Sequence, residues 1–312
     1  GDVALVLLDI NMPVLDGFDV LSAMNRDHSI EDIPVIMISS DDSKDIIRRA
    51  FERGVSDYIS RPFDARTVYR RAFNTIRLYA KQRRLVRMVS AQTRKQEHNT
   101  TMLVNVLSQI VEFRNGESGS HVRHIRILTE KIMAQLLRKT DKYSLSSEEQ
   151  DNITLASVLH DIGKIAIDEK ILNKPGRLTP EEFAVLKTHT TEGAALLHRL
   201  ENFDTEPLLQ TACDIARWHH ERWDGRGYPD GLAGDDIPIG AQLVSLADVY
   251  DALTSERCYK KAFPHEKAVQ MILGGECGTF NPLLLECLKD IEGSLQAELK
   301  KDYHSDPAEL EV

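Results

Sequence analysis

The chain has 312 residues, a length that predicts about two domains of roughly 150 residues each. Its hydrophobic fraction of 42% and charged fraction of 28% are those of an ordinary globular protein with a sizeable core. The formal net charge of −10 argues against a general nucleic-acid surface, because such surfaces bind phosphates through clustered lysine and arginine. We therefore expect no nucleic-acid polymer as a partner.

Cysteine usage and hydropathy point to the cytoplasm. The four cysteines lack the paired spacing of a zinc site, and no signal peptide precedes them, so we predict free thiols. No apolar run approaches the ~20 residues that a membrane helix requires, so no membrane contact is expected. The chain starts at Gly1 rather than Met, directly inside a predicted strand, which suggests a fragment.

The first part of the chain alternates predicted strands with predicted helices. Continuous apolar runs at residues 3–8 and 34–38 indicate buried parallel strands, and residues 57–60 form a third. One helix opens at Asp16-Gly17 and another covers residues 43–53. Polar residues follow each strand, at the sheet edge where open α/β folds place their sites. We predict an α/β domain with a parallel sheet.

The residues at these strand ends resemble the second half of a two-component receiver domain. The resemblance implies that Asp9 is the phospho-acceptor, that Ser39 contacts the phosphoryl group, and that a sensor histidine kinase is the partner of the full-length receiver. Arg61 stands where the family has lysine before Pro-Phe, and its planar guanidinium does not replace a compact ammonium. The family's acidic pair on the first strand has no counterpart before Val3. We expect a truncated receiver that is not phosphorylated at Asp9.

A long helical stretch follows the receiver-like segment. Residues 64–113 contain neither proline nor glycine, which permits one long helix or two helices end to end. Apolar residues recur there at helical spacing, and we predict that the helix pairs with a second copy as a homodimer. Amphipathic helical patterns then continue almost to the end, so the second domain is predicted to be all-α. The predicted boundaries are a partial receiver at 1–80, a helical linker at 81–102, the all-α domain at 103–300 and a tail at 301–312.

Two adjacent histidines mark the centre of the second domain. His219 and His220 end an apolar, helix-like run and lead into a loop that holds three glycines and a proline. Neutral imidazoles are the commonest metal ligands in proteins, and glycine lets backbone approach a ligand closely. An isolated histidine pair of this kind would more simply be a solvated surface feature. The rest of the chain favours the metal-binding interpretation.

Further metal-capable groups end or interrupt apolar helices. His160-Asp161 terminates one apolar run, His189 lies four residues before Gly193, and Asp248 sits inside a strongly apolar helix. Charge among apolar neighbours is costly unless it is paired or bound to a metal. Asp248 is the clearest case, with a structural salt bridge to Arg or Lys as its alternative. Glu117 and His121 share a helix face, a weaker signal because such surface pairs are common.

These motifs closely resemble the HD-GYP family of metal-dependent cyclic di-GMP phosphodiesterases. The resemblance rests on His160-Asp161-Ile162-Gly163-Lys164, on His219-His220-Glu221, and on the run from Asp224 to Leu232 that contains Gly227-Tyr228-Pro229. It implies the following metal ligands: Glu117, His121, His160, Asp161, His189, His219, His220 and Asp248. It also assigns catalysis to His160, Asp161 and Lys164, and contacts with the dinucleotide to Lys164, Tyr228, Arg257 and Lys260.

Eight oxygen and nitrogen ligands exceed what one octahedral ion can use, so we expect two or three transition-metal ions. Iron or manganese fits best, with nickel, cobalt or zinc as alternatives. The predicted reaction is hydrolysis of cyclic di-GMP to pGpG and on to GMP. A catalytically weak cyclic-dinucleotide sensor, or a hydrolase of another cyclic nucleotide, remains as the competing interpretation.

Overall fold

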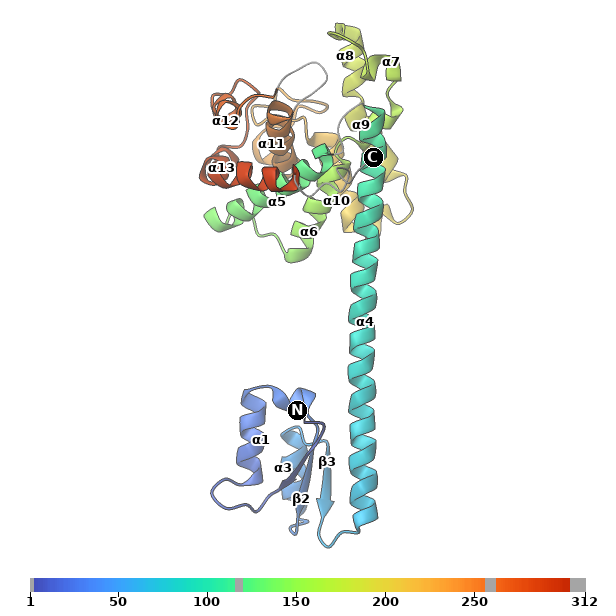
Figure 1. Ribbon diagram of the computed structural model, residues 1–312, viewed down its shortest axis with the longest axis vertical. Coiled ribbons are helices and arrows are strands. Elements are labelled where there is room, and N and C mark those ends of the chain that lie inside the picture. The colour runs from blue at the N-terminus through green and yellow to red at the C-terminus, as the bar shows by residue number, and fades with distance from the viewer. Residues whose placement is uncertain (1–2, 116–119, 256–261, 304–312) are drawn as a thin grey trace, which may run out of the picture. The chain divides into compact units, whose positions relative to one another are not determined.

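The computed structural model describes residues 3–115, 120–255 and 262–303, which form two compact units that meet between Glu97 and His98. The first unit is α/β with a small parallel sheet, and the second is all-α (Figure 1). The predicted fold class is therefore confirmed.

The sheet of the first unit has three parallel strands in the order β1-β2-β3. Its elements are β1 (Val6–Asp9), α1 (Gly17–Arg26), α2 (Ser29–Asp32), β2 (Val35–Ser39), α3 (Lys44–Glu52) and β3 (Asp57–Ser60). The first strand begins at Val6 and not at residue 3, whereas the third matches its predicted range. Asp16 caps α1 with its side chain, as the Asp-Gly signal indicates.

One face of this sheet packs against α1 and α3. Leu8, Met37 and Tyr58 point to the same face, because side chains alternate along each strand, and they share a buried cluster with Leu21 and Ala50. Because the three strands are parallel, their carboxyl ends lie together at one edge of the sheet. That edge carries the residues which the receiver resemblance singled out.

At this edge the guanidinium of Arg61 contacts the Asp9 carboxylate. Arg61 Nη2 lies 2.7 Å from Asp9 Oδ2, and the Asp9 side chain is 32% exposed. Ser39 is buried, and its Oγ accepts a hydrogen bond from the Asp41 backbone at 3.1 Å. Among the residues that the structure covers, no cluster of carboxylates or imidazoles able to hold a metal includes Asp9.

We predict that this chain does not respond to phosphorylation at Asp9. The Arg61 guanidinium neutralises the acceptor carboxylate, and no metal-binding cluster of the described residues surrounds it to assist phosphoryl transfer. Adding a small phosphodonor should therefore change neither turnover nor the oligomeric state, measured by product chromatography and light scattering. A response that disappears in Asp9→Asn would show this prediction to be wrong.

The long helix α4 (Ala65–Arg114) is uninterrupted, and the boundary between the two units falls inside it. Residues 81–102, the predicted helical linker, lie within this one helix, which is the first of the two possibilities that the absence of proline and glycine allowed. In the first unit, α4 is tied to the sheet by Arg71, whose Nη1 lies 2.9 Å from Asp57 Oδ1. The Tyr79 hydroxyl lies 3.0 Å from Ser56 Oγ.

The second unit consists of helices and the loops that join them (Figure 1). After the end of α4 come α5 (Ser120–Lys139), α6 (Ser147–Ala156), the 3₁₀ helices η1 (Ser157–Leu159) and η2 (Ile162–Ala166), α7 (Glu169–Leu172), α8 (Pro180–Lys187), α9 (His189–His198), η3 (Phe203–Thr205), α10 (Pro207–Trp218), η4 (Gly234–Asp236), α11 (Ile239–Thr254), α12 (His265–Leu273) and α13 (Pro282–Tyr303). Helix α13 passes residue 300, so the predicted tail begins inside a helix.

The core of this unit is built on the apolar stripe of α5. Ile125, Leu128, Ile132 and Leu136 recur every three or four residues and are fully buried. Helix α5 packs against α11 and α13, while α10 packs against α6 and α9. Helix α10 also packs against α11, so it connects the α6 and α9 side of the core with the α5 and α11 side.

Two remaining sequence expectations concern membranes and cysteines. Within the described ranges, no helix combines the length and apolarity needed to cross a membrane. Cys213 and Cys287 form no disulfide bond, and burial raises the pKa of both thiols. Both side chains are therefore protonated near neutral pH.

Candidate metal centre

The predicted metal ligands converge from five segments of the second unit. His121 lies on α5, His160-Asp161 joins η1 to η2, His189 begins α9, His219-His220 follows α10, and Asp248 lies on α11. All of the predicted ligands except Glu117 belong to the described residues. Glu117, like the predicted substrate contacts Arg257 and Lys260, lies outside them.

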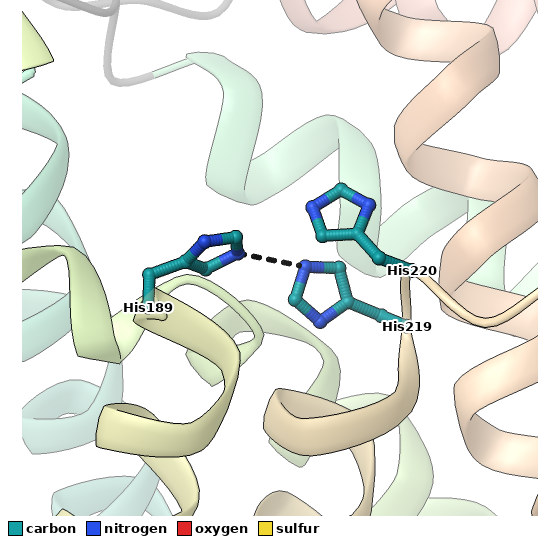
Figure 2. A group of neighbouring side chains, drawn as sticks. All are labelled: His189, His219 and His220. Atoms are coloured by element: carbon teal, nitrogen blue, oxygen red, sulfur yellow. Dashed lines mark hydrogen bonds between the residues drawn. The ribbon is translucent and has the colours of Figure 1, made fainter. Parts of the chain in front are cut away.

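One group of ligands consists of His189, His219 and His220 (Figure 2). One ring nitrogen from each lies within 4.8 Å of the others. His189 Nδ1 is 2.7 Å from the Leu186 carbonyl, and His219 Nδ1 is 3.0 Å from the Ile215 carbonyl. A carbonyl oxygen can only accept, so both Nδ1 atoms carry the proton and both Nε2 atoms present lone pairs.

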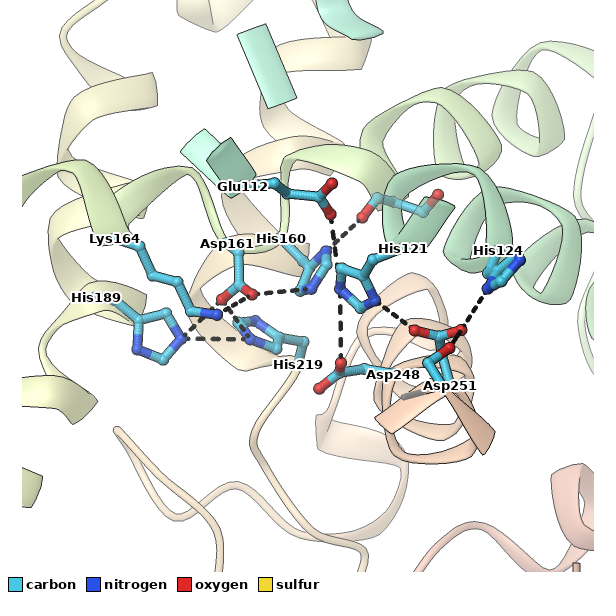
Figure 3. A network of polar contacts seen from close by, with 12 residues as sticks. Glu112, His121, His124, His160, Asp161, Lys164, His189, His219, Asp248 and Asp251 are labelled. Atoms are coloured by element: carbon cyan, nitrogen blue, oxygen red, sulfur yellow. Dashed lines mark hydrogen bonds and ion pairs between the residues drawn. The ribbon is translucent and has the colours of Figure 1, made fainter. Parts of the chain in front are cut away.

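A second group consists of His121, His160 and Asp248, again with ligand atoms within 4.8 Å of one another (Figure 3). His160 Nδ1 donates to the Ser157 carbonyl at 2.9 Å, which leaves its Nε2 directed into the site. No arginine or lysine of the described residues forms a salt bridge with Asp248, so the structural alternative proposed for that carboxylate has no support.

Asp161 lies between the two groups (Figure 3). Its Oδ2 is 3.3 Å from His160 Nε2, and its Oδ1 is 3.4 Å from His189 Nε2 and 3.9 Å from His219 Nε2. Each carboxylate oxygen thus faces a different group. A carboxylate in this position can bridge two cations.

The donor set fits a metal ion better than it fits hydrogen bonding alone. Burial lowers the pKa of His189 and of His219, so both rings are neutral. Their Nε2 lone pairs nevertheless face each other at 3.5 Å, and Asp161 Oδ1, beside them, has no hydrogen-bond donor in the part of the chain that the structure describes. Three acceptors that converge without a donor repel one another unless a cation lies between them.

The surroundings of the site also shift the pKa values of His220, His160 and Asp161. Burial lowers the pKa of His220 to about 4, which makes it neutral and available as a ligand. Burial disfavours the charged forms of both His160 and Asp161. The Asp161 carboxylate outweighs burial at His160 and raises the pKa of that imidazole. Lys164 and His160 outweigh burial at Asp161 and lower the pKa of that carboxyl group.

Two glycines allow the segments of the site to approach each other. A Cβ at Gly163 would lie 1.9 Å from the His189 carbonyl oxygen and 2.4 Å from Gly193 N. Any side chain at Gly163 would therefore push η2 away from α9. Gly193 is the partner in this close contact, since a Cβ added to it would lie 3.1 Å from Gly163 N.

Lys164 and Tyr228 border the centre. Lys164 Nζ lies 2.6 Å from Asp161 Oδ2, and the Tyr228 ring is 4.8 Å from the His220 ring, centroid to centroid. The loop that carries Tyr228 is held by Glu221, whose Oε1 accepts from the backbone of Asp230 at 2.7 Å and of Gly231 at 2.9 Å. Glu221 therefore fixes the backbone of this loop at Asp230 and Gly231.

Sequence reasoning missed three residues around His121. Asp251 is 1% exposed, and its two oxygens lie 2.6 Å from His121 Nδ1 and 2.6 Å from His124 Nδ1. Glu112, near the end of α4, places Oε1 4.0 Å from His121 Nε2. Asp248, by contrast, is 19% exposed, so the most deeply buried carboxylate of α11 is Asp251. The available signal was spacing, since Asp251 and His124 each follow a predicted ligand by three residues.

Comparisons with known proteins agree with this geometry. Residues 105–277 match the HD domain family, and residues 1–73 match the response regulator receiver domain. A probable cyclic di-GMP phosphodiesterase of Vibrio cholerae is 36% identical over 293 residues, which are 90% of this chain and 66% of that protein. The cyclic di-GMP phosphodiesterase response regulator RpfG of Xanthomonas campestris is 35% identical over 96% of this chain and 77% of its own length.

A third relative differs in the substrate that its name gives. The 3'3'-cGAMP-specific phosphodiesterase 2 of Vibrio cholerae is 40% identical over 186 residues, which are 60% of this chain and 34% of that protein. The chain therefore spans between about a third and three quarters of the lengths of these relatives. It belongs to the HD domain family and carries a receiver-type segment before the HD domain.

Proposed function

We propose that the chain is a metal-dependent phosphodiesterase that hydrolyses cyclic di-GMP. The observation that carries the proposal is the pair of ligand groups joined through Asp161, because two adjacent cations suit the cleavage of a phosphodiester. The similarity to two proteins named cyclic di-GMP phosphodiesterases supports the choice of substrate. Intact ligands argue against a catalytically weak sensor.

Different residues of the chain would bind the metal ions and stabilise the reacting phosphodiester. His189, His219 and His220 would hold one ion, His121, His160 and Asp248 another, and Asp161 would bridge them. Bound ions supply Lewis acidity toward a phosphodiester oxygen and toward water. Lys164 adds positive charge where negative charge grows as water attacks phosphorus and the bond to the 3′ oxygen breaks. We favour iron or manganese because the ligands are imidazoles and carboxylates without thiolates.

The test combines metal analysis with product chromatography. Protein purified without chelator, under air and anaerobically, should contain at least two equivalents of transition metal and convert cyclic di-GMP in the presence of Mn²⁺ or Fe²⁺. Less than one equivalent, with no activity restored by either ion, would overturn the proposal. Turnover of 3'3'-cGAMP in preference to cyclic di-GMP would instead favour a second candidate function, the hydrolysis of another cyclic dinucleotide. The similarity to the 3'3'-cGAMP-specific phosphodiesterase supports that candidate.

We predict that Lys164→Ala keeps its metals and loses turnover. The ammonium is not a metal ligand, and a hydrogen bond to a charged group contributes about 1.5–3 kcal/mol, so kcat/KM should fall roughly 10- to 100-fold. Steady-state kinetics and elemental analysis on one preparation measure both quantities. Lys170→Ala, which removes an exposed lysine from α7, should resemble the parent protein. Loss of metal in Lys164→Ala would contradict the assigned role.

We propose that the end product is set by Glu117, which precedes His121 by four residues in the sequence. We propose that its carboxylate serves a third ion, which would let pGpG bind again with its remaining phosphodiester over the centre and yield GMP. Its alternative role is a hydrogen bond to His121. In Glu117→Ala we expect pGpG to accumulate, measured by chromatography, while the exposed control Glu130→Ala yields GMP. An unchanged metal count with pGpG converted at the parent rate would exclude a third ion.

We also propose that two copies pair through α4, with a sensor histidine kinase acting on the full-length receiver. Leu85, Met88 and Val89 recur at helical spacing and are 52%, 56% and 65% exposed, which is unusual for large apolar side chains. Light scattering should give the mass of a dimer. Leu85→Glu combined with Val89→Glu should give a monomer, and a monomeric parent protein would contradict the pairing.

A further inference from the structure

The last residue of α4, Arg114, contacts the segment that carries Lys164. Its guanidinium donates through Nη2 to the Ile167 carbonyl at 2.8 Å and through Nη1 to the Ile165 carbonyl. The same Nη1 lies 3.5 Å from the Lys164 carbonyl. One side chain of α4 therefore contacts three backbone carbonyl groups at the end of the 3₁₀ helix η2.

The end of a short helix requires donors of this kind. Its last carbonyl groups have no amide of the same helix to accept from, and they carry partial negative charge. A guanidinium suits them because its donors lie on separate nitrogens in a rigid plane, and Nη1 and Nη2 here contact different carbonyls. Ile165 is 48% exposed, so its side chain adds little packing at this point. Arg114 therefore fixes backbone that the side chain of Ile165 does not.

The backbone of Arg114 makes a second contact with the same segment. Asn173 Nδ2 donates to the Arg114 carbonyl at 3.0 Å, and Asn173 is the residue at which α7 ends. The stretch from the end of η2 to the end of α7 is therefore tied to α4 at both of its ends. A single residue of α4 makes both contacts.

The position of η2 matters because this helix joins two groups of the metal centre. Asp161 directly precedes η2, and the Lys164 amide donates to the Asp161 carbonyl at 2.9 Å. The Ile167 amide in turn donates to the Lys164 carbonyl at 3.1 Å. Lys164 Nζ reaches Asp161 Oδ2 at 2.6 Å (Figure 3). A shift of the end of η2 would therefore move Lys164 relative to Asp161, and a displacement of about 1 Å can slow a reaction roughly 100-fold.

We propose that Arg114 is a positioning residue that acts on the reaction through Lys164. Its guanidinium contacts backbone carbonyls and no metal ligand of the described residues. The proposal rests on the proposed function, because it uses the role given there to Lys164. Two consequences follow from this route. Loss of Arg114 should cost no more turnover than loss of Lys164, and it should cost little in a protein that already lacks Lys164.

A double-mutant cycle on Mn²⁺-loaded protein, with cyclic di-GMP as the substrate, tests this route. Arg114→Ala should keep its metals and lower kcat/KM about 10-fold. In the Lys164→Ala background the same change should lower it less than about 2-fold, because residues that act through one another are not additive. Arg114→Lys, whose donors lie on one atom, should fall between Arg114→Ala and the parent protein. Arg177→Ala, at an exposed arginine of the same unit, is the matched control.

Hydrogen–deuterium exchange gives a second readout that does not require turnover. In Arg114→Ala, amides of residues 162–173 should exchange at least about 10-fold faster than in the parent protein. Amides of α9 and α11 should keep their parent rates. Arg177→Ala should leave all three segments unchanged. Thermal unfolding of each variant shows whether it is folded, and Arg114→Lys allows the same comparison if Arg114→Ala is not.

The outcomes separate this inference from the proposed function. If the parent protein hydrolyses cyclic di-GMP and the two losses add in the double variant, Arg114 does not act through Lys164 and the inference is wrong. Parent-like kcat/KM in Arg114→Ala, or unchanged exchange at residues 162–173, also overturns it. If the parent protein hydrolyses no cyclic dinucleotide, the proposed function falls. Faster exchange would then still support the hold of Arg114 on η2, and unchanged exchange would refute it.

Discussion

Asp161→Asn is expected to lose bound metal and turnover together. Asp161 faces His160 with one oxygen and His189 and His219 with the other, so it contacts both ligand groups. An amide carries no charge and presents one oxygen instead of two, so it cannot bridge two cations in the same way. We expect less than one equivalent of metal and a fall in turnover of at least about 1,000-fold, or roughly 4 kcal/mol.

Elemental analysis and steady-state kinetics check this prediction. Asp151→Asn is the matched control, because Asp151 is an exposed carboxylate on α6 of the same unit. It should keep both metal and activity. An Asp161→Asn protein that retains two equivalents of metal would contradict the bridging role, and one that also retained turnover would remove Asp161 from the reaction.

Asp251→Asn should weaken metal binding although Asp251 lies behind the ligands. Its two oxygens accept from His121 and His124, and these contacts outweigh burial and lower its pKa. By holding the proton on His121 Nδ1, the carboxylate keeps Nε2 unprotonated, which is the form of that atom that binds a cation. Loss of such a partner typically costs 10- to 100-fold in metal affinity. Breaking a buried ion pair also costs about 3–5 kcal/mol of stability.

Competition with a chelator measures the affinity, and thermal unfolding measures the stability. Ser255→Ala is the matched control, because it removes only the hydroxyl that donates to Asp251 Oδ1 at 2.8 Å. That variant should retain its metals and lose little stability. Parent-like metal affinity in Asp251→Asn would show that the histidine orientation does not depend on this carboxylate.

Local sequence signals singled out most of the side chains that the structure brings together, because each predicted ligand ends or interrupts an apolar helix. His219 and His220 directly follow α10, and His160-Asp161 follows η1, as their patterns indicated. Such positions can be predicted from sequence because caps, glycines and apolar periodicity each involve only a few neighbouring residues. The range of β3 was predicted correctly for the same reason, since it too depends on neighbouring residues.

The domain boundary and Asp251 could not be found in this way. Helix α4 has no glycine or proline at residues 81 or 102, so nothing local marks where one compact unit gives way to the other. Asp248 and Asp251 lie three residues apart in one apolar helix, and both could be the buried carboxylate. Which one meets His121 Nδ1 depends on how α11 packs against α5.

The sequence by itself determined the two domain types, the ligand chemistry and the glycine loop at Tyr228, because these follow from residue type and short spacing. Only the tertiary structure decided that Asp161 joins two ligand groups, that Asp251 orients His121, and that Arg114 contacts the end of η2. The physical reason is that helix periodicity specifies which face of a helix is buried. It does not specify which residue of another helix that face meets.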